Sequence, residues 1–183
     1  MTIHITTDFL IKVDSEITLF LPTVEEAEEL FLLVDRNRTH LRNFLGWLDN
    51  SLEVADTRKF IQENLPLWLQ LHSLHLSIRH GKDLVGAVGF HQIDFQNQSA
   101  FMGYWLDEEY QGKGIMTKSV KTLMNYGFEV LKLHRIQILC AKHNKRSEKI
   151  ALHLGFEKEG VLKDAIHHYG SFFDAYIYSK IKK

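Results

Sequence analysis

The chain has 183 residues, 45% of them hydrophobic and 25% charged, which is typical of a soluble globular protein of one domain. Its 22 lysines and arginines nearly balance its 23 aspartates and glutamates, which excludes a strong overall attraction to nucleic acid or to an anionic membrane. The single cysteine excludes an internal disulfide, and the absence of a signal peptide or of an apolar run of roughly 20 residues predicts one cytoplasmic domain over residues 1–183.

The first 72 residues predict one strand followed by helices. Residues 17–21 read as a strand, and Thr23 with Glu26 forms a capping box that opens a helix ending near Asp35. Residues 39–47 are predicted to be helical, and another helix is predicted to begin at the cap Asp56 and to bend at Pro66. The apolar positions expected to be buried on these three helices are Ala27, Leu30, Phe31 and Val34, then Leu41, Phe44 and Trp47, then Phe60, Leu67, Trp68 and Leu71.

From residue 74 the pattern changes to strands. Segments 74–79, 84–94 and 101–106 are separated by polar turns and predict an antiparallel meander. After Gly114 the apolar residues recur at offsets of three and four, which predicts a helix packed on the sheet. A strand at 135–141, a short helix at 147–154 ended by Gly155, and strands at 161–163 and 173–179 complete the order. The predicted fold class is therefore mixed α/β (α+β).

A glycine pair stands between the last strand of this meander and the following helix, within the segment YWLDEEYQGKGIMTKSV at residues 104–120. Gly112 and Gly114 lack a Cβ, so the backbone can turn tightly and a ligand can approach it closely. Backbone N–H groups and the positive end of the helix dipole then point at one place, which favours a phosphate. The spacing is not that of a Walker loop, and Thr117 stands where a dinucleotide fingerprint needs its third glycine. Taken alone, the pair also fits a tight turn without a ligand.

Three segments, GYWLDEEYQGKGIMTKSV, CAKHNKRSEKIALHLGFEKEG and GSFFDAYIYS, together resemble the GCN5-related N-acetyltransferases (GNAT) in order and spacing. They look most like the RimJ/RimL branch, nearest the RimL type, whose members acetylate the amino termini of ribosomal proteins. The likeness is close over residues 84–179 and general before residue 70. It implies a mixed, mostly antiparallel sheet of about seven strands, splayed in the middle, with helices on both faces. It also implies acetyl-CoA as co-substrate and a homodimer.

The resemblance further implies which residues hold acetyl-CoA in the splay between the strands that end at Leu106 and Ala141. The family's pyrophosphate pattern is Gln/Arg-x-x-Gly-x-Gly/Ala, and this chain departs from it by having Glu109 at the first place and Gln111 nearer the glycines. Asn144 and Ser147 match the family's Asn-x-x-Ser pair on the other wall, although both residue types also fit helix capping. The implied cofactor-binding residues are the backbone of Tyr104, Trp105 and Leu106, the loop Gln111, Gly112, Lys113, Gly114, Ile115, Met116 and Thr117, and Asn144 with Ser147.

The implied reaction needs a neutral amine, a donor for the oxyanion and a proton for the departing thiolate. An amino-terminal amine has a pKa of about 7.7–8.0, so its deprotonation costs only about 1 kcal/mol at neutral pH and a strong base is not essential. A strand N–H near Trp105 or Leu106 is expected to serve the oxyanion. Ser147 is the predicted acid, because Ala151 stands where many relatives carry a tyrosine.

The general base is less defined by the sequence. Phe101 stands where many relatives carry a glutamate, so His91 on the preceding strand is the first candidate, and a surface strand histidine is its alternative. His167 and His168, near Asp174, are second candidates, against the reading that they belong to a solvated loop.

Other chemistry is not favoured by the sequence. Cys140 has no evident histidine partner, so we expect a buried small hydrophobe and not a nucleophile. The eleven histidines are not spaced as ligands with Cys or Glu, so no metal is expected. Two alternatives to a protein acceptor stay open: transfer to a small amine such as a polyamine, an aminoglycoside or an amino acid, with the choice made in the loops at residues 36–54, and a CoA-binding module without activity.

Overall fold

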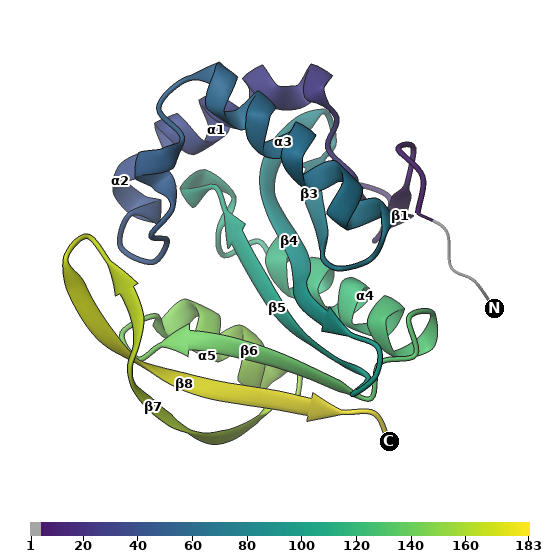
Figure 1. The fold of residues 1–183 in the computed structure, drawn as a ribbon, viewed down its shortest axis with the longest axis vertical. Coiled ribbons are helices and arrows are strands. Elements are labelled where there is room, and N and C mark those ends of the chain that lie inside the picture. Colours follow the sequence, from purple (N-terminus) through teal and green to yellow (C-terminus); the bar gives the residue numbers. More distant parts are fainter. Residues whose placement is uncertain (1–4) are drawn as a thin grey trace.

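The computed structural model describes residues 5–183, whose strands form one eight-stranded sheet in the order β1-β2-β3-β4-β5-β6-β8-β7 (Figure 1). The strands are β1 (Leu10–Lys12), β2 (Ile17–Phe20), β3 (Leu74–His80), β4 (Asp83–Asp94), β5 (Ser99–Leu106), β6 (Arg135–Ala141), β7 (Glu157–His168) and β8 (Ser171–Ile181). The helices are α1 (Ala27–Arg36), α2 (Arg38–Leu41), α3 (Val54–Leu69), α4 (Ile115–Glu129) and α5 (Lys145–His153). In Figure 1, α1 and α3 lie on one face of the sheet and α4 and α5 on the other, as the family resemblance implied.

The sheet is interrupted between β5 and β6. These two strands are parallel and pair only over Ser99–Phe101 with Arg135–Gln137, whereas every other neighbouring pair is antiparallel. Beyond Phe101 and Gln137 the two strands diverge, so residues 103–106 pair with β4 on one side, while their other backbone edge faces a gap and not a partner strand. The predicted splay between the strands ending at Leu106 and Ala141 is thereby confirmed.

The core lies on both sides of β3, β4 and β5. The predicted helix face after Gly114 is buried as expected, with Val120 and Leu123 fully enclosed. Gly127 on this face allows α4 to approach the sheet, because a Cβ there would stand 2.7 Å from the ring of Phe90. Among residues 5–183, no helix is long and apolar enough to cross a membrane.

The structure corrects the sequence prediction mainly in the first helices. The helix predicted at 39–47 ends at Leu41, where the Asn43 side chain donates to the carbonyl groups of Thr39 and His40 and so takes over carbonyls at the helix end. The N-cap of α3 is Glu53, and Asp56 is instead the third helical residue of a capping box, accepting from the backbone N–H of Leu52 and Glu53.

Burial on α1 and α3 also differs from the prediction. Leu33, and not Phe31, completes the buried face of α1. On α3, Phe60 and Leu67 are 41% and 43% exposed, while Ile61 joins Trp68 in the core. The face that α3 turns toward the core is the row through Thr57, Ile61 and Trp68, which leaves Phe60 over a cavity.

Candidate active site

The glycine loop between β5 and α4 is open and presents backbone donors. Gly112 and Gly114 have φ of 75° and 77°, and Gly114 is the N-cap of the 15-residue helix α4. A Cβ built on either glycine meets nothing within 4 Å, so space for a ligand lies directly outside the backbone. A helix of this length leaves its first N–H groups without helical partners and carries a positive dipole end there. The arrangement therefore fits an anionic phosphate group.

The start of this loop is held by the end of α1. Asp107 is buried, and its Oδ2 accepts from Arg36 Nη2 at 2.6 Å and from Arg36 Nε at 3.2 Å. The backbone N–H of Glu108 donates to Asn37 Oδ1 at 3.0 Å, and the Asn37 amide donates to the carbonyl of Leu33. These contacts fix where β5 ends and where the glycine loop begins.

The opposite wall of the splay is the first turn of α5. Asn144 is the N-cap of α5, and its Oδ1 accepts from the backbone N–H of Ser147 at 3.1 Å, so the capping reading is confirmed for Asn144. Ser147 lies inside the first turn, and its hydroxyl is 2.9 Å from the hydroxyl of Tyr104 on β5. The structure thus joins two predicted site residues, Tyr104 and Ser147, by a direct contact across the gap.

Gln111 links three segments at the mouth of the glycine loop. Its Nε2 is 2.8 Å from His40 Nε2 on α2, and its Oε1 accepts from Arg146 Nη1 on α5. Neither His40 nor Arg146 was identified from the sequence. Arg146 had a detectable signal, since a basic residue directly before Ser147 stands beside a predicted phosphate site, but His40 comes from a segment whose path the sequence did not define.

The β7–β8 hairpin closes the gap on the far side from β5. Four rings from four segments lie in contact one after another, with centroid distances of 5.7 Å for Phe44 with His143, 5.2 Å for His143 with Phe173 and 4.7 Å for Phe173 with His168. The first and last pairs are stacked and the middle pair is tilted. The Tyr169 hydroxyl donates to a backbone carbonyl of the α2–α3 loop at 2.8 Å. We call this contact between the hairpin tip (residues 167–173) and the α2–α3 loop (residues 42–53) the strap.

The second candidates for the base take part in the strap and do not form a cluster with the first candidate. His168 is 6% exposed, so the solvated-loop reading is wrong for it, whereas His167 is exposed. Burial lowers the pKa of His168, with smaller contributions from the neighbouring His143 and His167. Asp174 accepts from Lys142 Nζ at 3.1 Å and from the backbone N–H of Asp164.

A cavity of about 670 Å³ lies between α3, the α2–α3 loop and the front face of β3, β4 and β5. Its aromatic walls are the exposed Trp47, which lies 6.4 Å from Trp105, and the exposed Phe60, whose ring meets Trp68 and His75 at 5.7 Å and 5.6 Å. The cavity also reaches Tyr104 and so adjoins the splay. An apolar cavity with aromatic walls beside a reaction centre is the usual form of a substrate site.

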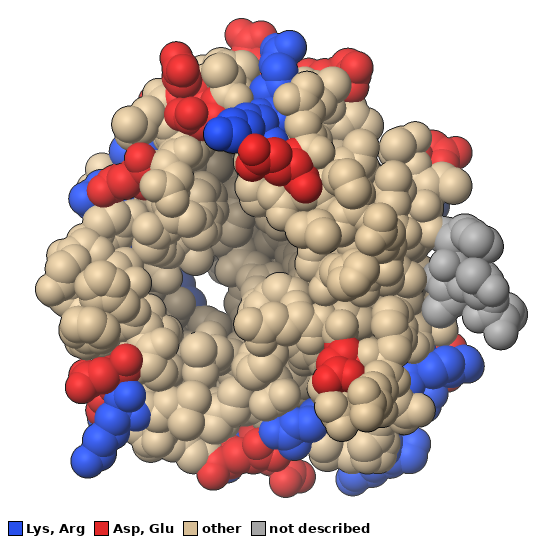
Figure 2. Space-filling view, viewed as in Figure 1, with Lys and Arg blue, Asp and Glu red and all other residues tan. Residues whose placement is uncertain are grey.

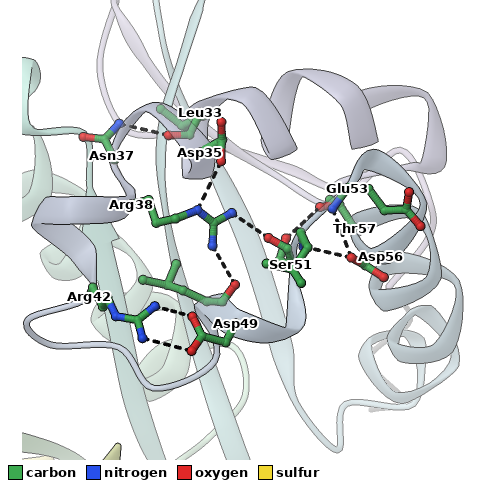
Figure 3. A network of polar contacts seen from close by, with 12 residues as sticks. Leu33, Asp35, Asn37, Arg38, Arg42, Asp49, Ser51, Glu53, Asp56 and Thr57 are labelled. Atoms are coloured by element: carbon green, nitrogen blue, oxygen red, sulfur yellow. Dashed lines mark hydrogen bonds and ion pairs between the residues drawn. The ribbon is translucent and has the colours of Figure 1, made fainter. Parts of the chain in front are cut away.

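The loop that carries Trp47 is fixed by two arginines (Figure 3). Arg38 donates to the carbonyl groups of Leu48 at 2.8 Å and Ser51 at 2.6 Å, and its Nε donates to Asp35 at 3.1 Å. Arg42 forms a two-bond ion pair with Asp49. The sequence could not predict this loop, because its path depends on arginine contacts with backbone carbonyls and not on a local propensity.

His91 and His75 line the front of the cavity on β4 and β3. His91 keeps much of its surface exposed, but its ring stacks on Phe101 with a centroid distance of 5.8 Å. The atoms around the ring partly shield it from water, and this desolvation lowers its pKa. Burial between Trp68 and Phe60 lowers the pKa of His75 to about 4. Both imidazoles are therefore neutral at neutral pH, the form in which histidine accepts a proton.

Cys140 is a buried thiol beside the Ser147 wall. It is 2% exposed, its S–H donates to the carbonyl of Asn144 at 3.4 Å, and burial raises its pKa. A protonated, enclosed thiol is a poor nucleophile, in line with the expected structural role. Among residues 5–183 there is no group of three or more His, Cys, Asp or Glu side chains that could hold a metal ion.

Seen as a surface, the front of the molecule is hollowed near its centre, and an opening passes through it there (Figure 2). In the same orientation, Figure 1 has β5 on one side of this opening and the β7–β8 hairpin on the other. Most Lys, Arg, Asp and Glu side chains lie toward the outer rim, and the hollow is lined mainly by other residues, with a basic side chain visible at the opening. The opening makes the centre of the molecule accessible from both faces.

Comparison with known proteins agrees with this geometry. Residues 16–157 match the family described as Acetyltransferase (GNAT) domain. The ribosomal-protein-serine acetyltransferase of Escherichia coli (strain K12) is 32% identical over 171 residues, covering 93% of this chain and 96% of that protein. The structure of RimL, the ribosomal L7/L12 alpha-N-protein acetyltransferase, in complex with coenzyme A has a TM-score of 0.91 at 29% identity, covering 94% of this chain and 98% of that chain. The microcin C7 self-immunity acetyltransferase MccE, in complex with acetyl-CoA and AMP, has a TM-score of 0.90 at 36% identity, covering 94% and 96%.

Proposed function

Because the chain belongs to the GNAT family of acetyl-CoA-dependent acetyltransferases, we propose that its acceptor is the α-amine at the amino terminus of a ribosomal protein. The observation that carries the proposal is the aromatic cavity that reaches Tyr104 at the edge of the splay, in a molecule with an opening through its centre. Relatives that are similar over nearly the whole chain act on ribosomal proteins, as their names state. A chain terminus is narrow enough to enter such an opening end-first.

We assign the cofactor-binding roles as follows. The glycine loop and the first N–H groups of α4, from Gln111 to Thr117, hold the pyrophosphate, and the unpaired strand edge Tyr104–Leu106 binds the pantetheine amides. Arg146 adds a guanidinium beside the loop, since its contact with Gln111 already places it there. Asn144 contributes by capping α5 and so fixing the position of Ser147.

Residues of this chain can supply the oxyanion donor, the donor to the thiolate and the acceptor of the amine proton. The free N–H groups of the β5 edge near Trp105 or Leu106 stabilise the oxyanion. Ser147 donates to the departing thiolate, since Ala151 offers no hydroxyl one turn later. His91 accepts the amine proton through water, because its lowered pKa keeps it neutral. Direct transfer gains most of its rate from holding both substrates in the splay.

Turnover on defined amines tests the acceptor. Thiol release from acetyl-CoA is followed with peptides that match ribosomal-protein amino termini, with the same peptides blocked at the α-amine, and with Nα-acetyl-lysine. We expect release with the unblocked peptides alone. Release with Nα-acetyl-lysine and with blocked lysine-containing peptides at the rate of the unblocked peptides would contradict an α-amine acceptor. Ser147→Ala should lower kcat and leave the affinity for acetyl-CoA nearly unchanged.

A second candidate acceptor is a small amine that carries a purine or another planar ring. Two observations favour it: the aromatic walls of the cavity, and the likeness to MccE, which was solved with AMP as well as acetyl-CoA. Exposed Trp47 and Phe60 offer ring faces for stacking. AMP should then inhibit competitively against the acceptor and not against acetyl-CoA, and Trp47→Ala should abolish the inhibition. Leu52→Ala is the matched control, since Leu52 is exposed on the same loop but does not line the cavity.

Polyamines and aminoglycosides fit the cavity less well. The carboxylates among its described lining residues are Asp56 and Glu63. Asp56 accepts from two backbone N–H groups, and Glu63 lies 3.8 Å from Lys59 on the same helix. Both carboxylates therefore already have a partner within the chain, a pair of backbone N–H groups or a lysine, for which a polycation would have to compete.

We further propose that residues 1–183 act as one acetyltransferase domain, that the protein works in the cytoplasm, where ribosomal proteins are found, and that it forms a homodimer. The first is supported by the single sheet to which all the described strands, β1 to β8, belong. The last rests on the family resemblance, and light scattering at several protein concentrations tests it.

A further inference from the structure

The hydroxyl of Tyr104 has no role in the family pattern, which uses only the backbone of that residue, yet it lies at the centre of the site. Tyr104 comes from β5, on the face that packs against α4 and α5, and reaches across the splay to the first turn of α5. Its oxygen is 2.9 Å from Ser147 Oγ and 3.3 Å from the Ser147 carbonyl oxygen. One phenol therefore has two acceptors within reach, both on the residue assigned to the thiolate.

The number of protons at this contact defines what the pair can do. A serine hydroxyl has one proton and two lone pairs, and a phenol likewise has one proton to donate. If Ser147 donates to Tyr104, the Ser147 proton is occupied. If Tyr104 donates to Ser147 Oγ, the Ser147 proton is free to point into the gap, and a hydroxyl that accepts a hydrogen bond is also a stronger donor.

We propose that Tyr104 is a positioning residue for the leaving-group step, in which its hydroxyl donates to Ser147 Oγ and directs the Ser147 proton at the sulfur of coenzyme A. This rests on the proposed function, since it concerns the donor of that reaction. As the bond between the acetyl carbon and sulfur breaks, the electron pair passes to sulfur, and the Ser147 O–H hydrogen-bonds to it. Water supplies the proton that completes the thiol, and the attacking nitrogen loses one proton through water to His91, so acetyl-CoA and amine become thiol and amide.

The surroundings of Tyr104 suit a donor that stays protonated. The phenol is partly buried, and burial raises its pKa well above the ordinary range. Ala151, one turn beyond Ser147, is buried and has no polar atom in its side chain. The second hydroxyl that many relatives carry one turn further along α5 is thus absent here, and the hydroxyl that orients Ser147 comes from β5.

A double-mutant cycle tests whether Tyr104 acts through Ser147. Tyr104→Phe should lower kcat by about three- to tenfold, the loss expected for one hydrogen bond, with the KM for acetyl-CoA within about twofold of the parent. In the Ser147→Ala background the same change should cost nothing further. An equal loss in both backgrounds, or no loss in the parent, overturns the proposal.

Tyr178→Phe is the matched control. Tyr178 is a buried tyrosine whose hydroxyl donates to Glu148 on the same turn of α5 at 2.8 Å, so its loss perturbs α5 without removing the Ser147 contact. We expect Tyr178→Phe to keep its kcat in both backgrounds. A loss that equals that of Tyr104→Phe would show that any disturbance of α5 suffices, and would overturn the proposal.

A binding measurement gives an answer even if no acceptor is turned over. The pKa of the thiol of bound coenzyme A is measured from the ultraviolet absorbance of its thiolate, as a difference against the free protein. In the parent protein, Tyr104 and Ser147 together should lower this pKa below that of free coenzyme A. Tyr104→Phe should raise it toward the free value, but should have no effect when Ser147 is already alanine. An unchanged thiol pKa in Tyr104→Phe overturns the proposal, whereas failure to acetylate any amine contradicts only the proposed function.

Discussion

At the scale of single residues, the two loop glycines are best judged against a third glycine in the same conformation. Gly112 has φ of 75° with open space outside it, and Gly81, in the β3–β4 turn, has φ of 59° and is equally unobstructed. Alanine in a left-handed conformation costs about 1–2 kcal/mol wherever it stands. Only at Gly112 does the new Cβ also enter the space where the pyrophosphate is expected.

Gly112→Ala and Gly81→Ala should therefore lower the free energy of unfolding by similar amounts, while only Gly112→Ala raises the Kd for acetyl-CoA. Chemical denaturation measures the first effect and calorimetry the second. Equal Kd values for the two variants would contradict a phosphate site at the glycine loop.

The pH profile of kcat/KM separates the acceptor amine from His91. The amine must lose its proton, with a pKa of about 7.7–8.0, so log kcat/KM should rise with a slope of one below that pH. Burial lowers the pKa of His91, so this group stays neutral until the pH falls below the usual histidine range. Below that point protonation of His91 should steepen the slope to two. His91→Gln should keep a slope of one throughout, and a slope of two in this variant would place the relay elsewhere.

The sequence could predict those site residues whose positions are set by neighbouring residues in the chain. Gly112, Gly114, Asn144 and Ser147 lie at helix starts, where turn geometry and capping impose residue types that the sequence displays. The side-chain role of Tyr104 was not predictable, because an alternating strand pattern gives the face of a residue but not the partner that a diverging strand brings to it. The position of Phe60 in the cavity wall was missed for a related reason, since tertiary packing decides which face of α3 turns toward the core.

At the scale of elements, the strap depends on a close approach of two backbones. Gly46 in the α2–α3 loop lies against His168 of β7, and a Cβ at Gly46 would stand 2.7 Å from the Cβ of His168. The neighbouring contacts all join the same two segments, including the Arg42 guanidinium at 3.8 Å from the centre of the Tyr169 ring. Residues 39–47 were predicted as helix, and the chain instead unwinds after Leu41, which places Gly46 against the hairpin and Phe44 against His143 of the β6–α5 loop.

Gly46→Ala should push the hairpin tip away from the α2–α3 loop and widen the opening on that side. We expect a lower melting temperature and a higher KM for the acceptor, with a smaller change in the Kd for acetyl-CoA, whose loop lies on the other side of α2. Gly160→Ala is the control on the same hairpin, since its nearest neighbour to a built Cβ is 3.9 Å away. A Gly46→Ala variant with the parent's acceptor KM would show that the strap does not shape the acceptor site.

At the scale of the whole molecule, the sheet consists of two parts joined at a narrow place. The strands β1 to β5 form one part and β6, β8 and β7 the other, and three residue pairs between β5 and β6 connect them. Away from these three pairs, the strap and the Tyr104–Ser147 contact also connect the two parts. The sequence predicted β2 to β8, missed the three-residue β1, and shortened β7 and β8. The outer ends of β7 carry few apolar residues that would mark a strand.

A ligand that fills the splay should therefore stabilise the whole chain and not only its own loop. At one hundred times its Kd, acetyl-CoA should add about 2.7 kcal/mol to the free energy of unfolding, which for a chain of this size raises the Tm by about 5–11 °C. Hydrogen exchange should slow at both edges of the gap, at residues 103–106 of β5 and in β6, because pantetheine supplies partners that the diverging strands lack. Slowing confined to the glycine loop would mean that the cofactor binds at α4 without bridging the two parts, and the splay would then not be its site.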